Sequence, residues 1–155
     1  MRLRHRIAGI AMAGAVASGL IVAGGTAAEA GAYGCSGKFI RSWPISAKFV
    51  VVSDVRLYYN SSTRYSCAVN VKRKAYRGKK TQTDIEMLNQ TWAEDNQHKG
   101  VNWSKDGGKF SQYAGPVKVR GRSTKGKKYK ITIVASASGG SGVNTPPVWK
   151  TVWAY

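Results

Sequence analysis

Few side chains in this sequence have the chemistry that catalysis requires. His98 is the one histidine after residue 30 and could serve as a general base. It lies in the segment Asn-Gln-His-Lys-Gly, with neither a nucleophile motif nor a second metal-binding side chain beside it. Asp84 with Glu86, and Glu94 with Asp95, are better explained as acceptors for the many lysines than as catalytic pairs. The sequence therefore predicts a non-enzymatic protein that has no metal site and no cofactor.

Covalent chemistry is predicted instead at the two cysteines, Cys35 and Cys67. They lie 32 residues apart, and two cysteines in an exported chain allow one intramolecular pairing. A reactive thiol or a metal pair is the alternative, but the chain has no Cys-x-x-Cys motif. We predict a disulfide that ties the N-terminal end of the mature chain to a central strand.

Export is predicted from residues 1–30, which have the pattern of a secretory signal peptide. Basic residues at the start precede an apolar stretch over 7–25, and Ala28-Glu29-Ala30 is a cleavage motif. An uncleaved membrane anchor is the alternative, but the small residues before Gly31 favour cleavage. We expect a mature chain of residues 31–155 that forms a single secreted domain, with membrane contact limited to the leader.

The mature chain would be strongly basic. Residues 1–30 hold three of the 25 Lys and Arg residues and one of the seven Asp and Glu residues, so the remainder carries a net charge of +16. A single-signed excess of this size favours binding to polyanions. The first basic cluster comprises Lys72, Arg73, Lys74, Arg77, Lys79 and Lys80. The second basic cluster comprises Lys118, Arg120, Arg122, Lys125, Lys127, Lys128 and Lys130.

Short strands separated by Gly, Asn and Pro are predicted to carry these clusters. The predicted strands cover 47–52, 55–59, 65–73, 81–90, 110–113, 117–122, 129–137 and 148–155, and residues 81–90 have a helix as the alternative. Residues 92–108 are predicted to form a long polar loop, and 114–116 a turn. The fold class is therefore all-β: a single-domain antiparallel sandwich, or a closed barrel, of about eight strands.

Side-chain alternation predicts where the cations lie. From Tyr65 to Lys72 the odd positions are apolar, and the even ones, ending at Lys72, are predicted to face solvent. In 117–122 the cations alternate with buried valines, and 129–137 repeats the pattern, so we expect one crowded basic face on a hairpin. Such a face either binds an anionic partner or protects a strand edge and keeps the chain soluble.

Aromatic residues are numerous and could stack on sugars or bases. Trp149, Trp153 and Tyr155 share one side of the last strand, where we expect them to fill the core. Trp92 and Trp103 are the pair expected to be exposed. No motif of a nucleic-acid-binding fold is present, so nucleic acid is expected to bind only non-specifically through charge.

Four short blocks of the sequence resemble a known family. They read Ala-Tyr-Gly-Cys-Ser-Gly from Ala32, Leu-Tyr-Tyr-Asn from Leu57, Cys-Ala-Val-Asn-Val-Lys from Cys67 and Gln-Tyr-Ala-Gly-Pro-Val-Lys-Val from Gln112. These blocks are similar to the small secreted actinobacterial proteins typified by spore-associated protein A. After Arg120 the chain departs from that pattern. The resemblance implies an exported, non-enzymatic protein that is associated with spore or hyphal surfaces.

The sequence as a whole predicts a secreted basic domain at a cell or spore surface. Its expected partner is an anionic cell-wall or matrix polymer, bound through the two basic clusters. The alternative is a secreted inhibitor or toxin-like effector that binds one protein partner through residues 92–108.

Overall fold

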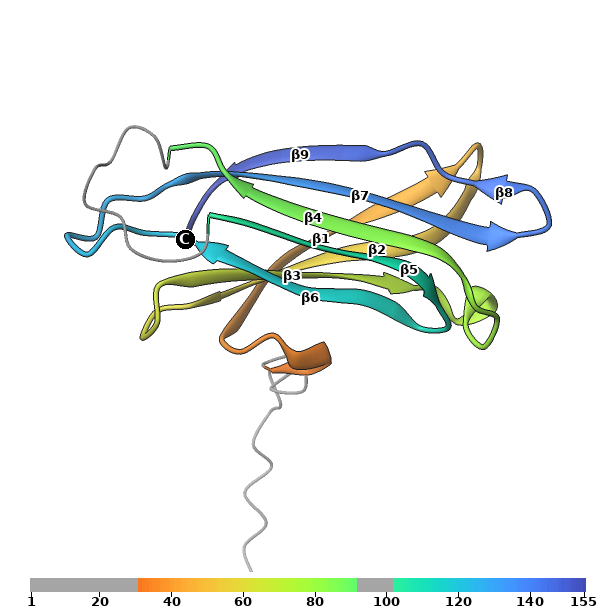
Figure 1. Cartoon of the computed structure of the whole chain (residues 1–155), viewed down its shortest axis with the longest axis horizontal. Coiled ribbons are helices and arrows are strands. Elements are labelled where there is room, and N and C mark those ends of the chain that lie inside the picture. Colours follow the sequence, from red (N-terminus) through yellow and green to blue (C-terminus); the bar gives the residue numbers. More distant parts are fainter. Residues whose placement is uncertain (1–30, 92–101) are drawn as a thin grey trace, which may run out of the picture.

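Two antiparallel sheets pack face to face in this computed structural model, which describes residues 31–91 and 102–155 (Figure 1). The first sheet has the order β1 (Lys38–Ala47), β2 (Val50–Asn60), β3 (Tyr65–Lys72) and β6 (Tyr113–Arg120). The second contains β5 (Trp103–Phe110), β4 (Thr81–Asn89), β7 (Lys130–Gly140), β8 (Val143–Asn144) and β9 (Val148–Trp153). Two short 3-10 turns, η2 (Ala32–Gly34) and η3 (Lys74–Tyr76), precede β1 and follow β3. The predicted all-β sandwich is confirmed, and residues 81–89 are a strand rather than a helix.

The main core lies between the sheets, and apolar residues at alternate positions of the longer strands fill it. Leu57, Val117 and Val119 face it from the first sheet, and Ile131 and Ile133 face it from the second. Apolar burial of this kind is the dominant favourable term in folding. No helix in the described part of the chain is long and apolar enough to cross a membrane.

A second apolar cluster covers the outer side of the first sheet. It contains Cys35, Tyr58, Cys67, Val69 and Val71, all fully or almost fully buried. The predicted disulfide between Cys35 and Cys67 is present, with the two Cα atoms 5.6 Å apart. The N-terminal segment can lie this close to β2 because Gly37 has no side chain: a Cβ there would collide with the Tyr59 carbonyl oxygen.

Strand β3 is buried on both faces, which corrects the prediction of one solvent face. Its odd positions, including Cys67 and Val69, pack in the outer cluster. Its even positions face the second sheet: the Asn70 amide donates to the carbonyl oxygens of Asp84, at 3.0 Å, and Ser136, at 2.8 Å. Alternation of residue types identified the strand. It could not show that the N-terminal segment, which is 32 residues away at the disulfide, covers the other face of this strand.

The predicted hairpin of 117–122 with 129–137 is wrong. β6 pairs with β3 in the first sheet, whereas β7 pairs with β4 and β9 in the second. Near their connecting loop the two segments share an isolated bridge, Arg122 with Lys128, and a hydrogen bond from the Tyr129 N–H to the Gly121 carbonyl oxygen at 2.9 Å, but no strand ladder follows in the described chain. The valines of β6 and the isoleucines of β7 fill the core from opposite sides, so their strands belong to different layers.

Two loop predictions are also corrected. Residues 103–108 belong to β5, an edge strand that pairs with β4 over its whole length, and its polar sequence needs no buried face. β6 continues through 114–116, where a turn was predicted, because Gly115 adopts a φ of 103° and the register with β3 shifts there. The turn lies instead between Phe110 and Tyr113.

Candidate functional site

The two basic clusters lie at opposite ends of the sandwich. The first follows β3 and surrounds η3, and the second includes the end of β6 and the connection to β7 (Figure 1). Because β3 and β6 are antiparallel, with Tyr65 opposite Arg120 and Val71 opposite Tyr113, their outer ends are separated by the length of a strand. Eight residues of strand span roughly 25 Å. The clusters therefore cannot form one continuous site.

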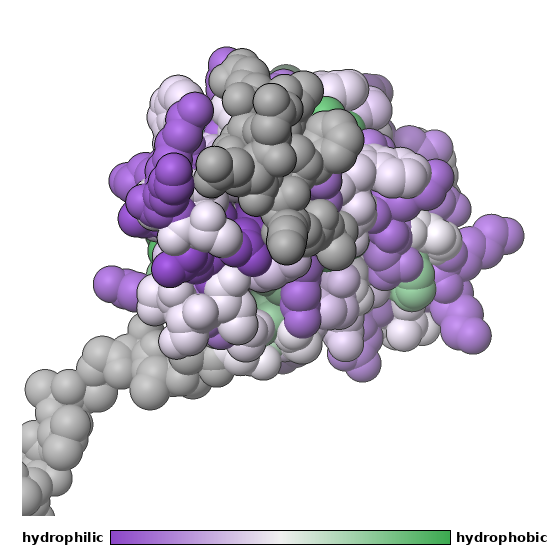
Figure 2. Space-filling view, turned by 60° about the vertical axis from the view of Figure 1, so that its left-hand side comes forward, coloured by the Kyte–Doolittle hydropathy of each residue, from purple (hydrophilic) through white to green (hydrophobic). Residues whose placement is uncertain are grey.

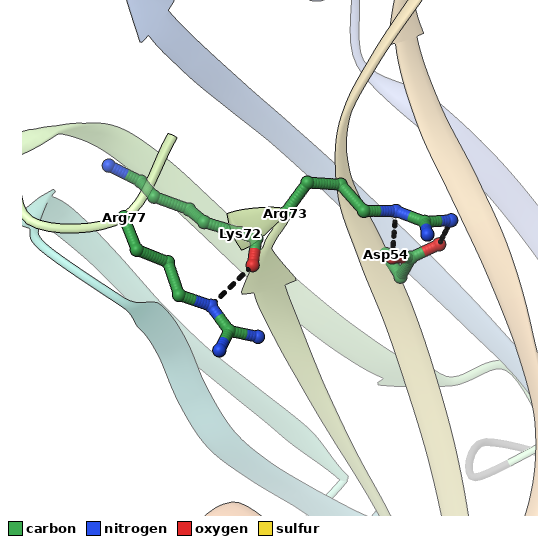
Figure 3. A network of polar contacts seen from close by, with 4 residues as sticks. All are labelled: Asp54, Lys72, Arg73 and Arg77. Carbon is green, nitrogen blue, oxygen red and sulfur yellow. Dashed lines mark hydrogen bonds and ion pairs between the residues drawn. The ribbon is translucent and has the colours of Figure 1, made fainter. Parts of the chain in front are cut away.

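Five members of the first basic cluster are exposed, and two of these are fixed by local contacts. The Arg73 guanidinium forms an ion pair with Asp54, with Nε and Oδ2 2.5 Å apart (Figure 3). The Arg77 Nε donates to the Lys72 carbonyl oxygen at 2.9 Å. Lys74, Lys79 and Lys80 have exposed side chains that can meet an anion.

Lys72 does not belong to this surface, which corrects its predicted place in the first cluster. Its side chain is completely buried and points away from Arg73, as Figure 3 shows. The Nζ donates to Thr81 Oγ1 at 2.5 Å and to the carbonyl oxygens of Phe110 at 2.6 Å, Lys79 at 3.2 Å and Thr81 at 3.3 Å. This ammonium joins the end of β3 in the first sheet to the start of β4 and the end of β5 in the second sheet.

Burial lowers the pKa of the Lys72 ammonium below its ordinary value of 10.5. Four oxygen acceptors surround the ammonium, and none of them is a carboxylate. A charged group that is desolvated without a counter-ion relies on such hydrogen bonds. The side chain is therefore assigned to the stability of the fold rather than to binding.

The second basic cluster contains two arginines that are held in place and five exposed lysines. Arg120 donates from Nε to the Arg122 carbonyl oxygen at 3.0 Å and lies over the Tyr65 ring. Arg122 donates from Nε to the main-chain oxygen of Tyr155 at 2.7 Å. The exposed members are Lys118, Lys125, Lys127, Lys128 and Lys130. Figure 2, which brings this end forward, shows hydrophilic residues projecting from it.

The turn that carries Lys125 and Lys127 has a fixed backbone. The Ser123 hydroxyl accepts from the Lys127 N–H at 2.9 Å, and the Ser123 N–H donates to the Lys127 carbonyl oxygen at 2.9 Å. The Arg64 guanidinium donates to the Thr124 carbonyl oxygen at 2.5 Å. Arg64 was missed from the sequence, because no strand pattern marks a turn residue that contacts a loop 60 positions away.

The described Asp and Glu side chains do not neutralise this end of the molecule. Each of the four described acids has a partner elsewhere: Asp54 with Arg73, Asp84 with Gln82 and Ser136, Glu86 with Trp103, and Asp106 with the Gly115 N–H. The exposed ammonium groups of the second cluster therefore generate a positive potential that extends about one Debye length, roughly 8 Å, at physiological salt.

Most of the side chains considered for catalysis, His98, Glu94 and Asp95, lie outside the described residues. Asp84 and Glu86 both lie on the outer face of β4, where each accepts a hydrogen bond from a neighbouring side chain. No group of three His, Cys, Asp or Glu side chains that could hold a metal ion occurs within the described ranges.

The tryptophans of β9 are exposed, which corrects their predicted place in the core. The exposed fraction is 69% for Trp149 and 59% for Trp153. Trp103 is exposed as predicted, although it stands on a strand, and Trp92 lies outside the described residues. The sequence correctly placed Trp149 and Trp153 on the same side of β9. The alternation of residues does not show which side of an edge strand faces the core.

Comparison of the chain with protein-family models, with curated proteins and with solved structures finds no match.

Proposed function

We propose that this chain is an exported, non-enzymatic adhesion protein that binds an anionic cell-wall or matrix polymer at a cell or spore surface. The observation that carries the proposal is the second basic cluster, whose five exposed lysines have no carboxylate partner in the described chain. The disulfide is compatible with an extracellular location, since such bonds persist in oxidising compartments. The resemblance of residues 32–120 to spore-associated proteins also supports this proposal.

The proposed mechanism is delocalised electrostatics on a rigid scaffold. A long polymer can contact the exposed lysines at both ends of the sandwich, and each contact raises the effective concentration of the polymer at the other end. No complementary pocket is needed, because each ammonium group attracts whichever anionic group lies nearest. Binding of this kind weakens as salt screens the charges.

Neutralising three lysines of the second cluster is expected to weaken retention on anionic walls by about 100-fold, taking about 1 kcal/mol for each cation near an anionic surface. The variant is Lys125→Gln/Lys127→Gln/Lys128→Gln, which leaves the Ser123 contacts to the backbone intact. The measurement is the affinity of the mature chain for isolated cell walls, and for walls stripped of their anionic polymers, from about 0.05 to 0.5 M salt.

A matched control removes the same charge from scattered exposed positions, as Lys38→Gln/Lys48→Gln/Lys109→Gln. If the cluster carries adhesion, this control retains most of the affinity. Equal losses in the two variants would assign adhesion to net charge alone. Equal retention on stripped and intact walls, or insensitivity to salt, would refute the proposal.

A further inference from the structure

The outer face of the second sheet carries three exposed tryptophans on an otherwise polar surface. Trp103 lies on β5, and Trp149 and Trp153 lie on β9, with exposed fractions of 51%, 69% and 59%. Between them the outward positions of β4 and β7 hold Leu88, Glu86, Asp84, Thr132, Val134 and Ser136. This arrangement alternates apolar rings with hydrogen-bonding groups over most of the width of the sheet.

Register places the three indoles at the corners of a triangle. Trp149 and Trp153 are four residues apart on one strand, which corresponds to roughly 13 Å. Trp103 is opposite Leu88, and Leu88 is opposite Thr132, so three strand spacings, roughly 14 Å, separate β5 from β9. Side chains of a sheet stand perpendicular to it, so these rings project on the same side.

At least one of the indoles is held in a fixed orientation. The Trp103 Nε1–H donates to Glu86 Oε1 at 2.6 Å, and the Lys105 ammonium lies 5.0 Å from the centre of its ring. Nearby, Thr132 Oγ1 and Thr151 Oγ1 are hydrogen-bonded at 3.0 Å between the two β9 tryptophans. A surface that is ordered before a ligand arrives loses less entropy on binding.

A groove of about 580 Å³ lies on this face across β5, β4 and β7, beside Trp149 and on the side away from Trp153. Its lining includes Asp84, Glu86, Lys105, Ser136 and Pro147, and also Val134, which is paired with Trp149. The groove is open over Asp84 because Gly107 stands opposite it: a Cβ at this glycine would lie within contact of the Asp84 carboxylate. Polar groups therefore converge beside exposed rings.

The charge of this face differs from that of the rest of the chain. Its outward strand positions hold two carboxylates, Asp84 and Glu86, and three ammonium groups, Lys105, Lys109 and Lys130. A net charge near zero makes this face unsuitable for a polyanion, although the mature chain is strongly cationic. The complementary ligand is uncharged, has flat apolar surfaces for the indoles and carries hydroxyl groups for the acceptors and donors between them.

We propose that the outer face of the second sheet is a binding platform for an extended, uncharged polysaccharide chain. The C–H faces of pyranose rings would stack on the tryptophans, as bases stack on aromatic side chains. Sugar hydroxyls would donate to Asp84 and Glu86 and exchange hydrogen bonds with Thr151 and Ser136. The platform shares only Lys130 with the basic clusters and does not bind through charge, so it would retain a glycan under salt conditions that release an anionic polymer.

The test measures binding of the mature chain to microcrystalline cellulose and to chitin, two uncharged polysaccharides, at about 0.5 M salt, where charge interactions are screened. The variants are Trp149→Ala and Trp153→Ala, singly and together. Loss of a stacking partner is expected to weaken binding about tenfold or more for each tryptophan. The lysine variant Lys125→Gln/Lys127→Gln/Lys128→Gln is the matched control, and its binding to these polysaccharides is expected to be unchanged.

Both tryptophans are mostly exposed, so the alanine variants are expected to keep the unfolding transition of the wild type. Absence of wild-type binding to both polysaccharides would overturn the proposal, as would equal binding by the double alanine variant. Sedimentation equilibrium provides a second test. A wild-type dimer that is lost in the double variant would show that this face binds a second copy of the chain and would overturn the proposal. Neither result would affect the proposed adhesion through the lysines, because that is measured on anionic walls.

Discussion

The double substitution Cys35→Ala/Cys67→Ala is expected to lower the free energy of unfolding by roughly 3.5 to 4 kcal/mol. The disulfide closes a separation of 32 residues and restricts the unfolded chain, and this restriction is lost in the variant. Because domains of this size are commonly stable by only 5 to 15 kcal/mol, the loss should be large in relative terms. Urea unfolding, followed by tryptophan fluorescence, measures it.

Reduction of the wild-type protein provides the matched control, since it breaks the bond without changing any other atom. The reduced wild type and the alanine variant should unfold at similar urea concentrations. Both cysteines are buried in the outer cluster, so a small extra loss in the alanine variant is expected from the missing sulfur atoms. A double variant that unfolds within about 1 kcal/mol of the oxidised wild type would contradict the structural role of this bond.

Replacing Lys72 with methionine is expected to lower the free energy of unfolding by about 3 kcal/mol, because several buried acceptors lose their donor. The oxygens of Phe110 and Thr81 lie closest to the ammonium, at 2.6 and 2.5 Å. Methionine keeps most of the aliphatic volume but cannot donate. It also removes the cost of burying a charge, which offsets part of the loss. Equilibrium unfolding in urea measures the balance.

Lys74→Met is the matched control for that substitution, because Lys74 lies two residues away with an exposed side chain. Its effect on unfolding is expected to stay within about 0.5 kcal/mol. If Lys72→Met were as stable as the wild type, the cost of desolvating the ammonium would equal the gain from the hydrogen bonds of its three N–H groups. That result would contradict the proposed role of Lys72 in holding the two sheets together.

The contribution of Lys72 to stability is expected to depend on pH. Since its pKa in the folded protein is below 10.5, the unfolded chain binds more protons at this position between the two values. The stability of the wild type relative to Lys72→Met should therefore rise with pH through that window and stay constant below it. Comparing the two proteins cancels the titration of the other lysines. A difference that shrinks toward pH 10.5 would contradict a lowered pKa.

The two proposed surfaces would bind chemically different polymers. The exposed lysines at the ends of the sandwich suit anionic polymers, and the tryptophan face of the second sheet suits uncharged sugar chains. A cell wall that contains both kinds of polymer would engage both surfaces of one molecule. Salt dependence separates the two contributions, because stacking on an indole is much less sensitive to screening than attraction between charges.

Local sequence patterns were sufficient to predict the elements that depend on residues close together in the sequence. Alternation over 65–72 and 130–137 reflects the two-residue period of a strand, so those strands were predicted correctly. The chain has two cysteines, which allow one intramolecular pairing, and the disulfide was predicted from that count. The polar composition of β5 led to the wrong prediction of a loop, because an edge strand forms through backbone pairing and needs no apolar side chains.

The sequence by itself determined the all-β class, the disulfide and the sign of the charge, all of which follow from local period, residue type and counting. Only the tertiary structure decided which residues meet. Lys72 is buried because residues of β4 and β5 close over it, and Trp149 is exposed because β9 joins the second sheet with that side outward. A two-residue period separates the two faces of a strand but does not show which face is buried. Pairing between strands that are distant in the sequence decides which face packs in the core and which faces solvent.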